Sequence, residues 1–247
     1  TSAEAKSPKN NSIITVEDGQ FMRDGKPYYF VGTNFWYGAI LGSEGEGGDR
    51  ERLAKELDFM KAHGIDNLRV LIGGEGENGL LGKIEPNLQP KPGEYNDEVL
   101  AGLDYLLMEL GKRDMTAVLY FNNAWEWSGG YTQYVAWANN EPVLVPRVDG
   151  WFSYNTFAGE FVRNERAKEL YYNHVRYIVT RTNRYTGIKY IDDPAIFSWQ
   201  ISNEPRAFSS KEQDNKEAFA EWITTSAKLI RELDPNHMIS TGSEGFY

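Results

Sequence analysis

Hydrophobic residues form two kinds of pattern that alternate along the chain. Short continuous apolar runs predict buried strands at residues 28–32, 67–72, 116–121, 195–201 and 237–241. Between these runs, apolar residues recur every three or four positions, which predicts helices at residues 49–63, 99–113, 165–185 and 211–233. A short hairpin is expected at residues 13–22, and residues 122–159 show no regular pattern. The sequence therefore predicts alternating strands and helices.

Such an alternation favours parallel strands joined by helical crossovers. Segments that follow the predicted strands are long and rich in Gly, Asn and Trp, whereas the segments before them are short. This asymmetry is typical of a (β/α)8 TIM barrel, in which one rim carries the functional loops. The rival is an open doubly wound sheet, complete with five strands, but no GxGxxG or GxxxxGK[ST] motif follows the first strand.

The barrel prediction accounts for roughly the first five βα units of the eight. About three units are then expected on a second polypeptide, or have been lost, because an open barrel would expose two strand edges. Residues 1–12 are polar and small, and we expect a flexible segment left after processing. Residues 13–247 are expected to form the N-terminal part of a single catalytic domain.

Composition narrows the classes of partner. The chain has 26 Lys and Arg against 36 Asp and Glu, and its formal charge of −10 disfavours nucleic acid. The absence of cysteine excludes disulfides, thiolate nucleophiles and zinc–thiolate sites, although it does not exclude export. No apolar stretch approaches the roughly 20 residues that a membrane span needs. Aromatic residues are abundant, and their flat faces suit sugars as well as a core.

A carboxyl group stands at the tip of one strongly apolar strand. Asn203, Glu204 and Pro205 follow the run at residues 195–201, and core packing gives no reason for an acid there. Barrel enzymes carry their proton-transfer groups at the carboxyl ends of strands. Glycoside hydrolysis uses one protonated and one ionised carboxyl group, so Glu204 is the candidate acid/base. Asn203 would offer its amide to a sugar 2-hydroxyl. The alternative is a helix-capping Glu in a loop.

Arg69 lies within an apolar strand, where a guanidinium needs a carboxylate partner. We expect it to hold a catalytic carboxylate in its ionised form, with a structural ion pair on the barrel floor as the alternative. Trp36, Trp125 and Trp127 lie after predicted strands and are candidates to line a sugar cleft, with core packing as the alternative.

The three histidines, His63, His174 and His237, do not cluster in the sequence and are expected to be structural. No HExxH pattern is present, so neither a metal site nor a cofactor is expected. Asp49 is expected to cap the first helix.

Further motifs occur in order from about residue 13 to residue 247. They are found at residues 88–90, 92–96, 102–104, 122–123, 129–130, 185–187, 192–199, 203–206 and 242–246. Together they resemble glycoside hydrolase family 5, and most of all its endo-β-1,4-mannanases. The resemblance implies a (β/α)8 barrel that cleaves with retention through a glycosyl-enzyme intermediate.

The same resemblance implies a role for each matching residue. Glu204 would be the acid/base, and Asn203 would bind the reacting sugar while Arg69 supports the nucleophile. Further substrate-binding positions are Trp125 as a sugar platform, Trp36 in the cleft, and Arg206 and Glu244 near the leaving-group subsites. The nucleophile of the family, a Glu at the tip of strand seven, would lie beyond this chain. Gln200 departs from the family, which often has Glu at that position.

The expected function is therefore retaining endo-hydrolysis of β-1,4-mannosidic linkages in mannan, glucomannan or galactomannan. The chain alone is expected to be inactive until a C-terminal fragment of the same barrel supplies strands six to eight. Two alternatives remain, an endo-β-1,4-glucanase of the same family and an inert remnant that binds β-mannan. A polysaccharide-degrading enzyme of this kind is expected to be secreted, or to lie at the cell surface or in the periplasm.

Overall fold

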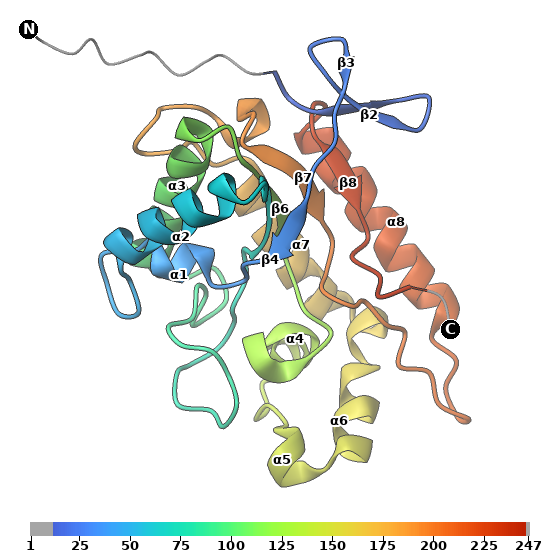
Figure 1. The fold of residues 1–247 in the computed structure, drawn as a ribbon. Coiled ribbons are helices and arrows are strands. Elements are labelled where there is room, and N and C mark those ends of the chain that lie inside the picture. The colour runs from blue at the N-terminus through green and yellow to red at the C-terminus, as the bar shows by residue number, and fades with distance from the viewer. Residues whose placement is uncertain (1–11, 246–247) are drawn as a thin grey trace, which may run out of the picture.

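The computed structural model describes residues 12–245, so nearly all of the segment expected to be flexible, residues 1–12, lies outside the described residues. A three-stranded antiparallel sheet opens the described chain. Its strands are β1 (Thr15–Glu17), β2 (Gln20–Arg23) and β3 (Lys26–Pro27). A parallel sheet follows, in which chain order and spatial order agree (Figure 1). Its strands are β4 (Gly32–Asn34), β5 (Asn67–Leu71), β6 (Thr116–Tyr120), β7 (Ile196–Gln200) and β8 (Met238–Ser240).

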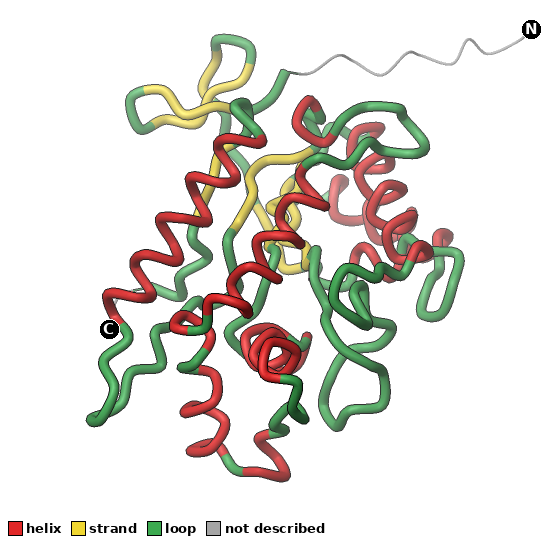
Figure 2. The backbone as a smooth tube through the Cα atoms, turned by 180° about the vertical axis from the view of Figure 1, so that it is seen from behind, coloured by secondary structure: helices red, strands yellow, loops and turns green. Residues whose placement is uncertain are grey.

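Helices connect the parallel strands and cover one face of the sheet, as the view from behind shows for the two long C-terminal helices (Figure 2). They are α1 (Gly38–Leu41), α2 (Arg50–Ala62), α3 (Asp97–Lys112), α4 (Gly130–Asn139), α5 (Pro146–Asp149), α6 (Trp151–Ala158), α7 (Glu165–Val179) and α8 (Lys216–Leu233). Short 3-10 turns lie at Glu126–Ser128, Phe161–Arg163 and Tyr190–Asp192. Asp49 caps α2 as expected, because its side chain accepts a hydrogen bond from the Arg52 backbone N–H. None of the helices in residues 12–245 has the length and apolarity to cross a membrane.

The register of the parallel sheet separates two sets of side chains. Leu71, Tyr120, Gln200 and Ser240 lie opposite one another on neighbouring strands, as do Arg69, Val118, Ser198 and Met238. These residues share the face that points away from the helices, which we term the inner face. The intervening residues Leu68, Val70, Leu119 and Trp199 are fully buried beneath the helices and form the outer face.

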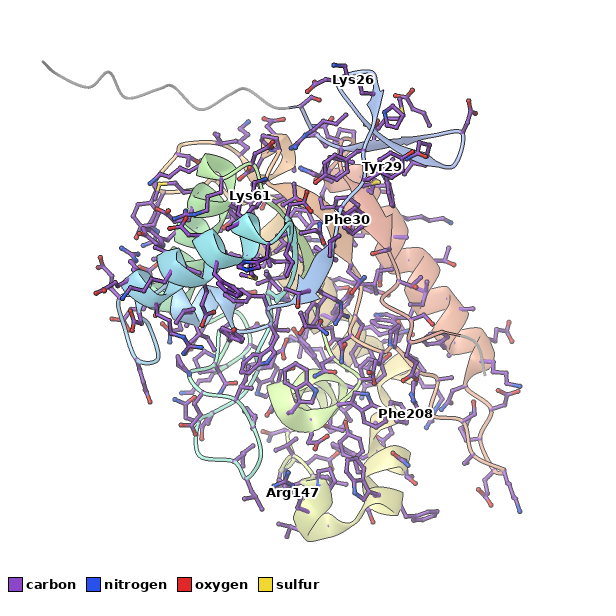
Figure 3. All side chains as sticks on the ribbon, viewed as in Figure 1. Lys26, Tyr29, Phe30, Lys61, Arg147 and Phe208 are labelled. Atoms are coloured by element: carbon purple, nitrogen blue, oxygen red, sulfur yellow. The ribbon has the colours of Figure 1, made fainter. Side chains whose placement is uncertain are left out.

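The two ends of the sheet differ as well. The hairpin strands lie at the N-terminal ends of the parallel strands, where Phe21 and Phe30 meet Phe197 edge-on at ring distances of 5.2 and 4.9 Å. Lys26, Tyr29 and Phe30 mark this end in Figure 3, whereas Arg147 of α5 and Phe208, in the loop after β7, lie toward the other end. The long loops and helices α4–α6 thus gather at the carboxyl ends of the strands.

Several predicted bounds are wrong. The first parallel strand was expected at residues 28–32, but β4 begins only at Gly32, because the Tyr28 N–H still bonds to Phe21 in the hairpin. The helix expected to reach residue 185 ends at Val179, where the Thr180 hydroxyl bonds back to the Arg176 carbonyl. The last helix begins at Lys216 rather than at residue 211.

The segment at residues 122–159, expected to be irregular, contains α4, α5 and α6. Seven consecutive residues of α4, from Gly130 to Ala136, are buried. A helix that is buried on all sides shows no amphipathic period, which explains why the sequence pattern did not reveal it.

Candidate active site

Glu204 lies just beyond β7 at the carboxyl end of the sheet, with its backbone in a strained conformation. Its φ angle is +47°, in the left-handed region that favours glycine. Neighbouring segments hold it there, because the Glu204 N–H donates to the Gly242 carbonyl (3.0 Å) and the Asn203 N–H to the Asn122 carbonyl (2.8 Å). A backbone outlier that is fixed from both sides is typical of a functional residue.

Gly242 allows the backbone after β8 to lie close to the backbone around Glu204. A Cβ atom at that position would lie 1.7 Å from the Ser202 carbonyl oxygen, so only glycine allows the segment after β8 to approach the segment after β7. The sequence pattern predicted Glu204 at the tip of a strand, and the structure puts it there. Its carboxylate accepts a hydrogen bond from the indole N–H of Trp125, at 2.6 Å.

Arg69 on β5 and Asn203 after β7 lie together on the inner face. The Arg69 guanidinium donates to Asn203 Oδ1 (3.0 Å) and to Gln200 Oε1 (2.8 Å), and it stacks 4.2 Å over the Tyr120 ring. These partners are amide oxygens, not the carboxylate partner that was expected for a buried arginine. Burial lowers the pKa of Arg69, while Tyr120 and the Glu204 carboxylate oppose that shift. The Glu204 carboxylate therefore interacts with Arg69 electrostatically, without a direct hydrogen bond.

The Asn203 side-chain amide has one defined orientation. Its Oδ1 accepts from Arg69, and its Nδ2 donates to Asn123 Oδ1 at 3.0 Å. A guanidinium can only donate, so the oxygen must face Arg69 and the NH2 group must face away from it. The second N–H of that group has no acceptor among residues 12–245 and is available to a ligand. Asn123 is a residue that the sequence prediction did not assign to the site, although it lies in a motif that carried the family resemblance.

Trp125, Arg206 and Glu244 are also brought together. The Arg206 guanidinium lies 4.9 Å from the centre of the Trp125 ring and forms an ion pair with Glu244. The three come from loops that follow β6, β7 and β8. They converge beside Glu204, and their assignment to a leaving-group subsite stays a prediction.

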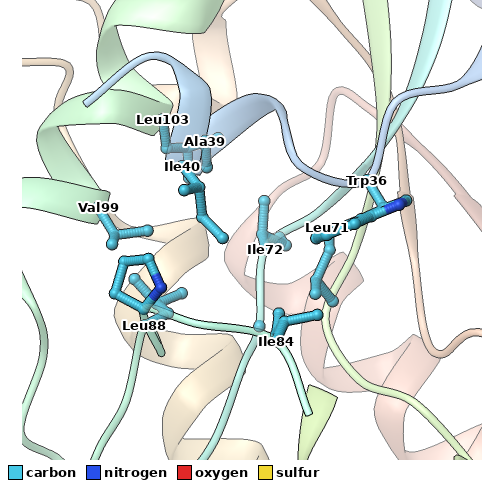
Figure 4. Close-up of a pocket in the computed structure, with 11 residues that line it drawn as sticks. Trp36, Ala39, Ile40, Leu71, Ile72, Ile84, Leu88, Val99 and Leu103 are labelled. Atoms are coloured by element: carbon cyan, nitrogen blue, oxygen red, sulfur yellow. The ribbon is translucent and has the colours of Figure 1, made fainter. Parts of the chain in front are cut away.

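Trp36 lies toward the opposite edge of the sheet, in the loop after β4. Its side chain is 38% exposed and meets Trp127 edge-on at 5.8 Å. The same indole borders a small apolar pocket between α1, α3 and the loop after β5 (Figure 4). Trp36 thus packs against the core and is partly open to solvent, and its expected place in a sugar cleft stays a prediction.

Glu75 is a buried acid that the sequence analysis did not single out. It follows β5 and is 1% exposed, and its carboxylate accepts from the Gly130 N–H (3.1 Å) and the Tyr134 hydroxyl (3.2 Å). Burial raises the pKa of Glu75 to about 7, although these two donors and Lys83 lower it. The residue fixes the start of α4, and thus the loop that carries Asn123 and Trp125. An acid directly after a strand was the available signal, as it was for Glu204.

His237 and His174 are both held by hydrogen bonds to groups within the fold. His237 lies between Asp234 and the Asp193 carbonyl, and His174 lies between the Ile72 carbonyl and the Tyr95 hydroxyl. Burial lowers the pKa of His174 to about 4, so this imidazole is neutral at pH 7. Within residues 12–245, His, Cys, Asp and Glu form no group of three or more that could hold a metal ion.

Comparisons with known proteins agree with this geometry. A family model described as GH family 5 beta-mannosidase-like matches residues 11–247. A putative mannan endo-1,4-beta-mannosidase 9 from Oryza sativa subsp. japonica is 32% identical over 244 residues, which cover 99% of this chain and 54% of that protein. The chain spans about half the length of the curated relatives it matches.

Solved structures give the same result. A family 5 mannosidase from Rhizomucor miehei in complex with mannosyl-fructose superimposes with a TM-score of 0.87 at 34% identity, over 95% of this chain and 56% of that one. An endo-1,4-beta-mannanase from the same organism gives a TM-score of 0.73 at 26% identity, over 96% of this chain and 62% of that one.

These neighbours are (β/α)8 barrels, and the parallel sheet of residues 32–240 corresponds to their first five βα units. The predicted fold class and the resemblance are therefore confirmed. By its sequence, its sheet and its family match, the chain belongs to glycoside hydrolase family 5.

Proposed function

We propose that this chain forms the acid/base half of a retaining β-1,4-mannan hydrolase, acting on mannan, glucomannan or galactomannan. The observation that carries the proposal is the Glu204 carboxyl group, which is presented at the carboxyl end of β7 by a strained backbone and a hydrogen bond from Trp125. The relatives in plants are named for cleavage of mannan, and we infer the class of substrate from these names.

In the first step, Glu204 donates its proton to the glycosidic oxygen while a second carboxylate attacks the anomeric carbon. In the second step, Glu204 accepts a proton from the water that hydrolyses the glycosyl-enzyme. The free N–H of Asn203 donates to the sugar 2-hydroxyl, and Arg69 keeps that amide in the required orientation. Arg206, Glu244 and Trp125 bind the leaving-group sugars, and Trp36 borders the other side of the cleft.

The attacking carboxylate is proposed to lie on the seventh strand of the barrel. Strands six to eight would cover the groove on the inner face that Val118, Ser198, Gln200, Met238 and Ser240 line. This proposal is supported by the length of the relatives, of which the chain covers 54% and 56% in two cases. We propose that the C-terminal half of the same barrel is the protein partner of the chain. The enzyme would act outside the cell or at its surface, where polymeric mannan is found.

An exo-acting β-mannosidase is the second candidate. The family model is described as beta-mannosidase-like, and the R. miehei mannosidase superimposes with a higher TM-score than the endo-mannanase from the same organism. Both candidates use the same two carboxyl groups. They differ in whether cleavage begins inside the polymer or at its end.

Hydrolysis assays separate the candidates. The complete gene product, by which we mean residues 1–247 together with the proposed C-terminal half, should release reducing ends from mannan and leave carboxymethyl cellulose intact. An endo-enzyme lowers the viscosity of galactomannan early and yields oligosaccharides, whereas an exo-enzyme yields mannose with little loss of viscosity. Residues 1–247 alone should be inactive and should gain activity when the C-terminal half is added. A complete gene product that binds mannan without cleaving it would contradict the proposal. The protein would then be a mannan-binding protein without catalytic activity.

A further inference from the structure

An aromatic cluster extends from Trp125 to the start of α6, and its members other than Trp125 have no role in the catalytic steps. It consists of Trp151, Tyr154, Phe208 and the already described Trp125. Trp151 meets Trp125 edge-on at 6.2 Å and Tyr154 edge-on at 5.6 Å, while Phe208 meets Trp125 at 5.5 Å. Helices α5 and α6 lie at the carboxyl end of the sheet, away from the hairpin (Figure 1). The cluster thus extends outward from Trp125, which donates a hydrogen bond to Glu204.

The rings of this cluster differ in exposure. Tyr154 is fully buried, and the Arg206 guanidinium covers part of Trp125. Trp151 is 52% exposed, and both of its ring neighbours meet it at steep angles of 74° and 77°. Solvent therefore reaches a large part of this indole, although tryptophan gains most from burial. The next residue, Phe152, is 85% exposed, and we interpret these two neighbouring exposed rings as part of a binding surface.

Trp151 is also held in a fixed position. The Tyr154 hydroxyl, one turn along α6, donates to the Ala124 carbonyl at 2.7 Å. That carbonyl belongs to the residue before Trp125, so the helix that carries Trp151 is tied to the loop that contacts Glu204. Gly150 starts α6 with a φ angle of +85°, which places Trp151 at the first helical position. A ring fixed before binding loses little conformational entropy when a ligand stacks on it.

The chemistry of the occupant follows from the surroundings. The face of a pyranose ring is apolar and flat, and its hydroxyls stay in water at the rim. The route from the Glu204 carboxylate passes through Trp125 and then Trp151, as successive sugars of a linear chain would. A net charge of −10 favours an uncharged polymer over an acidic one.

We propose that Trp151 forms a distal subsite, beyond Trp125 on the leaving-group side, that stacks against a pyranose of a β-1,4-linked mannan chain. This inference rests on the proposed function, because it assigns part of the same cleft. It predicts that long oligosaccharides depend on Trp151 and that short ones do not reach it.

Calorimetry on the complete gene product tests the subsite without turnover when Glu204→Gln is present. Mannohexaose and mannobiose are titrated into this protein with and without Trp151→Ala. We expect Trp151→Ala to weaken mannohexaose about tenfold, or roughly 1.4 kcal/mol, and to lower the ratio of hexaose to biose affinity by the same factor. Trp151→Phe, which keeps a flat ring, should recover most of the affinity.

Phe59→Ala is the matched control, because Phe59 is an exposed aromatic residue (63%) on α2 rather than α6. It should leave both affinities unchanged. Equal losses for hexaose and biose with Trp151→Ala would show a structural role and overturn the inference. Unchanged affinities, with a loss of self-association in gel filtration, would also overturn it and assign Val148, Trp151 and Phe152 to contact with a second copy. Chain-length dependence in a protein that never cleaves mannan would instead refute the proposed hydrolysis while the subsite stands.

Discussion

The two faces of the parallel sheet come from the same strands but differ in what they contribute. On the outer face, Leu68, Val70, Leu119 and Trp199 are fully buried under the helices. Each buried aliphatic side chain there stabilises the fold by about 1.5–3 kcal/mol. On the inner face, Arg69 and Gln200 are polar and only half buried. The alternation of a strand thus separates the residues that stabilise the barrel from those that serve the cleft.

The inner face keeps its polar groups at an energetic cost. Burial opposes the charge of Arg69, and the left-handed backbone of Glu204 costs on the order of 1 kcal/mol. Hydrogen bonds to β7, and to the segments that follow β7 and β8, hold both residues in place. The comparison therefore predicts that outer-face substitutions lower stability alone, while inner-face substitutions lower activity with little loss of stability.

Glu204→Gln should produce the largest effect. The amide oxygen can still accept from the Trp125 indole, but the side chain can no longer donate or accept the catalytic proton. We expect kcat on mannan to fall by about a thousandfold or more, with a thermal midpoint within a few degrees of the parent. Reducing-end assays and calorimetric melting of the complete gene product measure the two quantities. A large loss of stability would place Glu204 among the residues that hold the fold.

Leu119→Ala, on the outer face, should lower stability and leave activity unchanged, the opposite of Glu204→Gln. Leu119 is 0% exposed and lies on β6, so truncation leaves a cavity. The free energy of unfolding should fall by about 2–5 kcal/mol. Denaturant titration measures that loss, while kcat per folded molecule should stay unchanged. A specific loss of activity at full stability would show that the two faces are coupled, and would break the comparison.

Arg69→Met tests the inner face with a side chain of similar length. The substitution removes a half-buried charge but leaves the Asn203 and Gln200 amide oxygens without their donor, so we expect the free energy of unfolding to fall by about 1–2 kcal/mol. The Asn203 amide loses the donor that sets its orientation, and kcat/KM should fall roughly a hundredfold. Activity assays and denaturant titration on the same samples check both. A stability loss of several kcal/mol would support the alternative of a structural interaction at Arg69.

Strand order and the location of Glu204 were predictable from the sequence, because both follow from local patterns. Apolar runs revealed the strands of the sheet, and an acid directly after such a run indicated the site. Contacts between residues far apart in the sequence could not be predicted in this way. No local pattern indicated that Trp125 would bond to Glu204, 79 residues away, or that Arg69 would meet amides in place of a carboxylate.

Helix α4 and Glu75 show a second limit. The first seven residues of α4 are buried, and such burial removes the periodic pattern from which a helix is recognised. Glu75 is also buried, at 1% exposure. Glu75 accepts its hydrogen bonds from residues 55 and 59 positions further along the chain, so only the folded structure identifies its partners. Trp151 was hidden for a different reason, since an exposed aromatic residue in an irregular segment has no distinctive local pattern.

Glu75→Gln tests whether a buried polar group at the carboxyl end of the sheet lowers stability as the polar groups of the inner face do. The pKa of Glu75 in the folded protein is about 7, above its ordinary value of 4.5, so the folded state holds the proton more tightly. The stability that this proton contributes is complete below about pH 4.5 and is lost as the pH rises through about 7. The amide of the variant binds no proton, so the variant should gain roughly 3 kcal/mol relative to the parent between pH 4.5 and pH 8.

Denaturant titrations of both proteins at pH 4.5, 6 and 8 measure this difference. Other buried groups that titrate in the same range or below it, such as His174, are present in both proteins and cancel when one free energy of unfolding is subtracted from the other. A difference that does not change with pH would show that Glu75 is ionised throughout and is supported by Lys83. In that case the buried acid beneath the rim would resemble Arg69, a charge kept by its surroundings, and the cost of polar groups would extend from the inner face to the loops that carry the site.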